Sequence, residues 1–120
     1  MSLALAIAGV IHLVPLSGAL GADRLAALYG LTISEPSLVV LMRHRAVLFG
    51  LLGAFMLFAA IRPALQSLAL VAGFVSVLSF FWIAWSTGSY NDAVARIVAV
   101  DVVALVSLVF GTVAHVGKRA

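Results

Sequence analysis

The sequence has no cysteine and few charged residues. Without cysteine, the chain cannot form a disulfide, a thiolate nucleophile or a cysteine-ligated metal site. Only 9% of its residues are charged and 65% are hydrophobic, whereas ordinary soluble domains have about 25% and about 45–50%. Seven basic and four acidic side chains cannot cover the surface of a soluble protein of 120 residues. We therefore expect lipid to surround most of the molecule.

Acidic residues are scarcer than basic ones, and the formal net charge is +3. The basic residues occur singly or in pairs and form no basic face, so the sequence does not predict a nucleic-acid partner. They are better interpreted as residues that flank a membrane. One predicted side holds Arg62, Lys118 and Arg119, and the other holds Arg24 and Arg96. This difference favours a cytoplasmic location for the termini.

Long apolar segments dominate what the sequence does contain. A helix that crosses the hydrocarbon core needs about 20 apolar residues. Four segments meet this length, at residues 3–20, 38–61, 63–87 and 92–116. The sequence therefore predicts an all-α fold, an integral membrane four-helix bundle formed as one domain by residues 1–120.

The only sizeable connection joins the first and second spans. Its segment "ADRLAALYG", residues 22–30, predicts a short amphipathic helix at the membrane surface that ends at Gly30. Residues 33–37, "ISEPS", predict a turn in which Ser37 caps the second span. The upstream segment "SGALGA" is similar to a signal-peptide cleavage site. No Lys or Arg precedes the apolar run, so we expect no cleavage.

Charged residues lie inside the second span, where Arg43, His44 and Arg45 are consecutive. Counted from the face with the long connection at 1.5 Å per residue, Arg45 is about 10 Å deep, His12 about 12 Å and Asp101 about 13 Å. These three residues come from three spans and reach one level. An ionised side chain that faces lipid costs at least about 2.5 kcal/mol. We therefore predict that Arg45 and Asp101 face each other inside the bundle, directly or through one water.

Helix geometry limits which neighbours can join this pair. Arg43, His44 and Arg45 are separated by about 100° each, so all three cannot face the centre. We expect Arg45 to point inward because it is deeper, while Arg43 extends to the headgroups. Pro15 predicts a bend in the first span, and Asp92 with Arg96 predicts a surface pair at i,i+4.

Two tryptophans lie near the end of the third span. Trp82 and Trp85 are on one helical face, where they could roof a cavity or belong to an interfacial aromatic belt. We favour the belt for Trp85 and keep Trp82 as a candidate ligand contact. The predicted ligand-binding set is therefore His12, His44, Arg45, Trp82 and Asp101. Its histidines lack the spacing of a metal site, and we predict neither a metal nor a cofactor.

Three functions fit this pattern. The first is binding or transport of a small or lipid-like ligand at the polar cluster of His12, Arg45 and Asp101. The second is a membrane enzyme that acts on an apolar substrate, with His12 or Asp101 as acid or base. The third is an accessory protein in which the Arg–Asp pair only orders the bundle. Four spans bury little surface alone, so a homo-oligomer is a further possibility.

Two segments resemble a known family. "LYGL", residues 28–31, is followed by a polar turn and by "LMRHRAVLFGLLGAFMLFAA", residues 41–60. This arrangement resembles small bacterial membrane proteins of the DoxX-like group, in which a short surface helix precedes an arginine-bearing, glycine-rich second span. The resemblance implies the four-helix fold and a location in the bacterial inner membrane. It assigns no catalytic residue.

Overall fold

A computed structural model describes residues 1–32 and 35–119 of the chain. No described residue lies in a strand, and four helical segments are long and apolar enough to cross a membrane. The predicted all-α membrane fold is thus confirmed, and the chain is a multi-pass integral membrane protein. The elements are α1 (Ser2–Leu13), the 3₁₀ helix η1 (Val14–Leu20), α2 (Ala22–Tyr29), α3 (Pro36–Ala60), the 3₁₀ turn η2 (Pro63–Leu65), α4 (Gln66–Thr87) and α5 (Asp92–Arg119).

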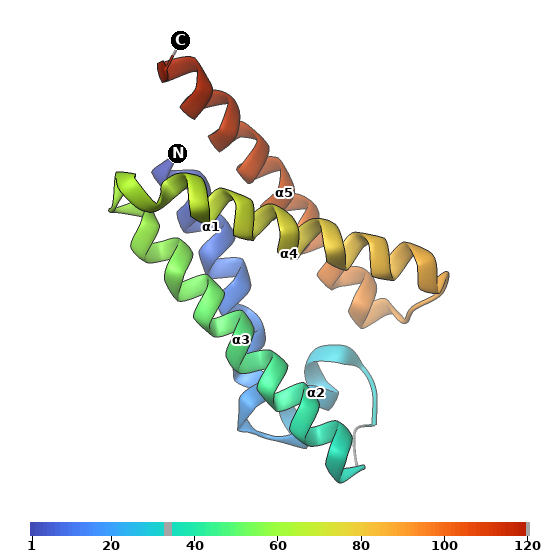
Figure 1. Cartoon of the computed structure of the whole chain (residues 1–120). Coiled ribbons are helices and arrows are strands. Elements are labelled where there is room, and N and C mark those ends of the chain that lie inside the picture. The colour runs from blue at the N-terminus through green and yellow to red at the C-terminus, as the bar shows by residue number, and fades with distance from the viewer. Residues whose placement is uncertain (33–34, 120) are drawn as a thin grey trace.

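The spans pack around α1, which contacts α3, α4 and α5. The start of α1, the turn between α3 and α4, and the end of α5 lie at one end of the molecule (Figure 1). The short helix α2 lies at the opposite end, where it contacts η1, α3 and α5. The expected surface helix therefore exists, and it is docked onto three neighbouring elements.

The boundaries of the elements follow from local chemistry. Pro15 has no backbone N–H, and the first span changes there from α-helix to 3₁₀ helix. Gly30 ends α2 with a left-handed φ of 64°, as expected. The prediction for Ser37 is wrong, because Glu35 caps α3 by accepting hydrogen bonds from the backbone N–H groups of Ser37 and Leu38. Pro36 suits the first helical position, so the helix begins earlier than predicted. Residues 33 and 34 of the expected turn lie outside the described residues.

Small residues let α1 and α3 approach closely. A Cβ atom added to Gly53 would lie 2.7 Å from the carbonyl oxygen of Gly9. No side chain could fit at this crossing without moving one helix. Such contacts are typical of membrane helices, which associate by close packing since lipid supplies no hydrophobic driving force.

The core has two parts. The main apolar cluster lies among α1, α3, α4 and α5 and includes Leu5, Met56, Val77 and Leu108. A smaller cluster holds α2 in place through Leu25 and Tyr29, which are one helical turn apart.

Candidate functional site

A small polar cavity lies where the predicted cluster was placed. It has a volume of about 30 Å³, and all five α-helices contribute to its lining. His12 comes from α1, Arg45 from α3 and Asp101 from α5, so the structure brings these three side chains to one cavity. Its remaining lining residues are Ile11, Pro15, Tyr29, Phe49, Phe80 and Ile97.

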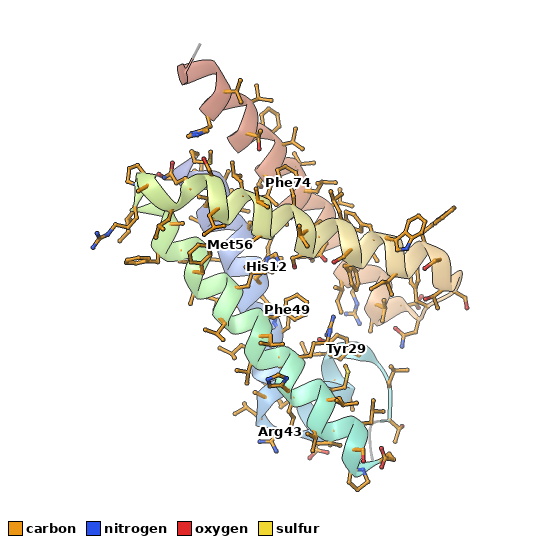
Figure 2. All side chains as sticks on the ribbon, in the orientation of Figure 1. His12, Tyr29, Arg43, Phe49, Met56 and Phe74 are labelled. Carbon is orange, nitrogen blue, oxygen red and sulfur yellow. The ribbon has the colours of Figure 1, made fainter. Side chains whose placement is uncertain are left out.

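His12 is buried and hydrogen-bonded at both ring nitrogens. Nδ1 lies 2.8 Å from the carbonyl oxygen of Ala8, and Nε2 lies 2.8 Å from Oγ of Ser76 on α4. A carbonyl can only accept, so Nδ1 carries a proton and donates it to Ala8, and Nε2 shares a hydrogen bond with the Ser76 hydroxyl. Its ring also packs 5.8 Å from that of Phe49 (Figure 2). His12 thus joins α1 to α4 and leaves neither nitrogen free for a substrate.

Arg45 reaches inward and is held by aromatic residues. Its Nη1 donates a hydrogen bond of 2.6 Å to the hydroxyl of Tyr29. The guanidinium carbon lies 4.6 Å from the ring centre of Phe49 and 5.4 Å from that of Tyr29. These cation–π contacts and the hydrogen bond offset the cost of placing a permanent charge within the span.

Arg45 and Asp101 line the same cavity, but no ion pair joins them within the part of the chain that the structure describes. The predicted direct contact between Arg45 and Asp101 is therefore not observed. A water needs about 10–15 Å³ of such space, so a cavity of about 30 Å³ has room for one. The contact through water stays a prediction.

The neighbours of Arg45 in the sequence point elsewhere. Arg43 is exposed, and its Nε donates a hydrogen bond of 2.8 Å to the carbonyl oxygen of Ala19 at the end of η1. His44 is also exposed and lines no described cavity. The 100° rotation between successive residues explains why only Arg45 of this triplet reaches the interior.

Trp82 is 65% exposed and does not line the cavity. Its ring lies 5.5 Å from that of Trp85, which is 74% exposed. The inner face of α4 carries Val77 and Phe81 instead, and Trp82 is rotated about 100° from Phe81. The structure therefore separates Trp82 from the other candidates, and both tryptophans have the outward position of an aromatic belt.

A second, larger cavity adjoins the first. It has a volume of about 280 Å³ and lies among α1, η1, α2 and α5. The two cavities share four lining residues, Ile11, Pro15, Ile97 and Asp101. Val14 and Val100 at its rim are 58% and 45% exposed, so this cavity opens sideways from the bundle. We call it the lateral cavity. A molecule in the surrounding lipid thus has a lateral route to Asp101.

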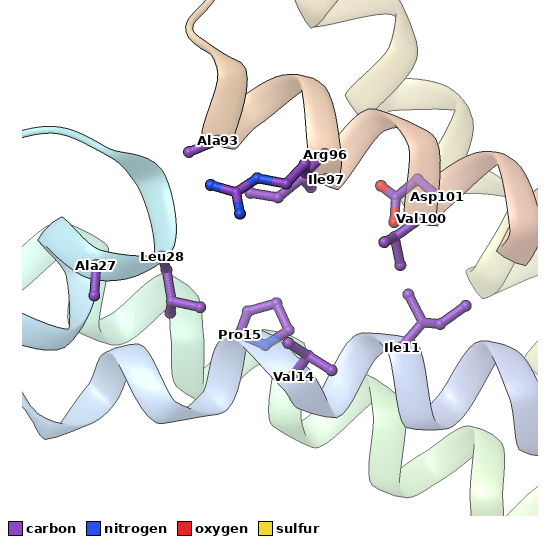
Figure 3. Close-up of a pocket in the computed structure, with 10 residues that line it drawn as sticks. All are labelled: Ile11, Val14, Pro15, Ala27, Leu28, Ala93, Arg96, Ile97, Val100 and Asp101. Atoms are coloured by element: carbon purple, nitrogen blue, oxygen red, sulfur yellow. The ribbon is translucent and has the colours of Figure 1, made fainter.

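Arg96 is exposed, as predicted, but it lines the larger cavity and does not pair with Asp92. No described carboxylate forms an ion pair with it. Figure 3 shows its guanidinium extending along the cavity toward Ala93 and α2, while the Asp101 carboxylate lies at the other end near Ile11. The cavity therefore has a basic end near the surface and an acidic group deeper inside.

Asn91 fixes α2 over the larger cavity. Its Nδ2 donates hydrogen bonds to the carbonyl oxygens of Tyr29 at 2.8 Å and Gly30 at 3.3 Å. Its Oδ1 accepts a hydrogen bond of 2.8 Å from the backbone N–H of Val94 and so caps α5. One side chain thus ties the surface helix to the fourth span.

Sequence reasoning missed Tyr29, Ser76, Phe80 and Arg96 as parts of the site. A signal existed for Tyr29, since it shares a helical face with Leu25 at i,i+4. Arg96 was misassigned because spacing shows that two residues can meet, not that they do.

Among the described residues, no group of three or more metal-ligating side chains is placed to hold an ion.

The chain matches no protein-family model, no curated protein and no solved structure.

Proposed function

We propose that this protein binds a small or lipid-like ligand at the two adjoining cavities, which the ligand enters sideways from the bilayer. The main supporting observation is the position of Asp101, which lines both the polar cavity and the lateral cavity. A polar group of a ligand in the lateral cavity can reach Asp101, while the rest of the ligand stays in apolar surroundings. The bacterial inner membrane and the DoxX-like relationship belong to the same proposal.

Three observations favour binding over the alternatives. Both ring nitrogens of His12 have partners, which argues against a role for His12 as acid or base. Arg45 is satisfied by Tyr29 and Phe49 rather than by a direct contact with Asp101, which argues against a purely structural ion pair. Asp101 accepts no hydrogen bond from any described residue and is half-buried. It is therefore available to a ligand.

The proposal is tested by filling the cavities without changing a charge. Ile97 lines both cavities, so Ile97→Trp should displace the ligand. Val102→Trp is the matched control, because Val102 lies on the same helix, is 46% exposed and lines no described cavity. Native mass spectrometry of protein purified in mild detergent should find a co-purified molecule on the unchanged protein and on Val102→Trp.

The same molecule should be missing from Ile97→Trp. Val14→Trp provides a second blocking variant at an exposed rim position, where the fold can accept a larger side chain. Retention of the same molecule by both blocking variants would contradict the proposed site, as would its complete absence from the unchanged protein.

A further inference from the structure

The lateral cavity continues as an apolar groove along the seam between α1 and α5. A neighbouring cavity of about 490 Å³ shares Ile11 and Val100 with the lateral cavity. A further cavity of about 360 Å³ shares Ile7 with this neighbouring cavity. Between Arg96 and Ala114 the three cavities follow eighteen residues of α5, or about 27 Å. This length is close to a hydrocarbon core of about 30 Å, so the groove can hold a long acyl chain in an extended form.

The charges that line the lateral and polar cavities favour an anion. Arg45, Arg96 and Asp101 are the charged residues that line the lateral and polar cavities within the described chain. Two arginines against one aspartate leave positive charge in excess. Arg96 has no described ion-pair partner, so a single negative charge on a ligand would complete the site.

The shape of the lateral cavity favours a small head group with a single chain. α2 covers the lateral cavity through Ala27 and Leu28, and Asn91 holds this helix in place. A carboxylate fits beneath that cover more readily than a glycerophosphate head with two chains. Resting on the function proposed above, we infer that the ligand is a long-chain carboxylate whose head binds Arg96 and whose chain lies in the α1–α5 groove.

The probe for this inference is palmitic acid that carries a mid-chain diazirine and a terminal alkyne. With the full chain in nanodiscs of neutral lipid, illumination should label α1 near Ile7–Ile11 and α5 near Val100–Val103. Arg96→Gln should weaken labelling about tenfold to a hundredfold, which is typical for loss of a hydrogen bond to a charged group. Arg96→Lys should retain most of it.

Two further variants complete the design. Val100→Trp should abolish labelling, because Val100 lines the groove and is exposed enough to accept a larger side chain. Arg62→Gln is the matched control, since Arg62 is an exposed arginine in the turn between α3 and α4, which lies at the opposite end of the molecule from α2 (Figure 1). Its labelling should equal that of the unchanged protein.

Three results would overturn the inference. The corresponding long-chain alcohol could label the groove equally well, or Arg96→Gln could label normally; either outcome excludes recognition of a carboxylate. A phosphatidylglycerol probe could displace the fatty acid, which would identify the occupant as a bilayer phospholipid. In each case a ligand lost specifically from Ile97→Trp would leave the proposed function standing, so the two failures are distinguishable.

Discussion

Replacing Tyr29 with phenylalanine isolates one contact that holds α2 against the bundle. The change removes only the hydroxyl that accepts the 2.6 Å hydrogen bond from Arg45. The ring stays, and with it the cation–π contact and the packing beside Leu25. Loss of a hydrogen bond to a charged group costs about 1.5–3 kcal/mol. Since 1.4 kcal/mol is a factor of ten, local opening of α2 should become about 10–100 times more frequent.

Amide hydrogen exchange measures this opening directly. Exchange at residues 25–29 should accelerate by that factor, whereas the buried amides of α4 should keep their rates. Tyr90→Phe is the matched control, because Tyr90 is exposed and its hydroxyl has no described hydrogen-bond partner. Unchanged exchange in α2 would refute the reasoning, and equal acceleration in α4 would show a general loss of stability instead.

Three other predictions follow from the site and the packing. Arg45→Leu should lower thermal stability in detergent more than Asp101→Asn does. The first change leaves Asp101 without its nearby cation, whereas after the second change Arg45 keeps its aromatic partners. Adding Asp101→Leu to Arg45→Leu should recover part of the loss, and strictly additive losses would contradict this coupling. Gly53→Ala should cost about 1–3 kcal/mol by overpacking against a backbone carbonyl of α1, whereas Gly117→Ala, where a Cβ meets nothing within 4 Å, should be tolerated. Backbone hydrogen bonds hold the pKa of Glu35 below its ordinary value of 4.5, so the stabilisation that Glu35 gives to the first turn of α3 is present above that value and is lost as pH falls through the lowered pKa. Glu35→Gln should therefore speed amide exchange in this turn at neutral pH. The ratio of the exchange rate in the variant to that in the unchanged protein should approach one in acid, and a ratio that stays high would contradict the prediction.

The fold could be predicted because its main cause is visible in the composition. Apolar segments of membrane length leave few alternatives, and Gly30, Pro63 and Asp92 mark boundaries by local chemistry. Counting residues at a uniform helical rise also grouped His12, Arg45 and Asp101, whose side chains line one cavity. Position along a helix axis depends only on residue number, so it can be read from the sequence.

Rotation about the helix axis was harder to predict. Hydrophobic periodicity orients a soluble helix, but here both the lipid-facing and the buried faces are apolar. Trp82 was therefore kept as a cavity residue although α4 turns it outward. Arg96 was treated as a surface partner of Asp92 for a similar reason: its real neighbours on α1 and α2 are distant in sequence.

The hydrogen bonds of Asn91 also constrain how the molecule is assembled. Its partner Tyr29 lies 62 positions earlier in the chain, so synthesis completes the second and third spans before this bond can form. During biogenesis the segment that becomes α2 must therefore wait at the membrane surface without its final anchor. The contacts of α2 with η1 and α3 can form before that point, but its docking is completed, and the lateral cavity fully lined, only when the start of α5 is in place.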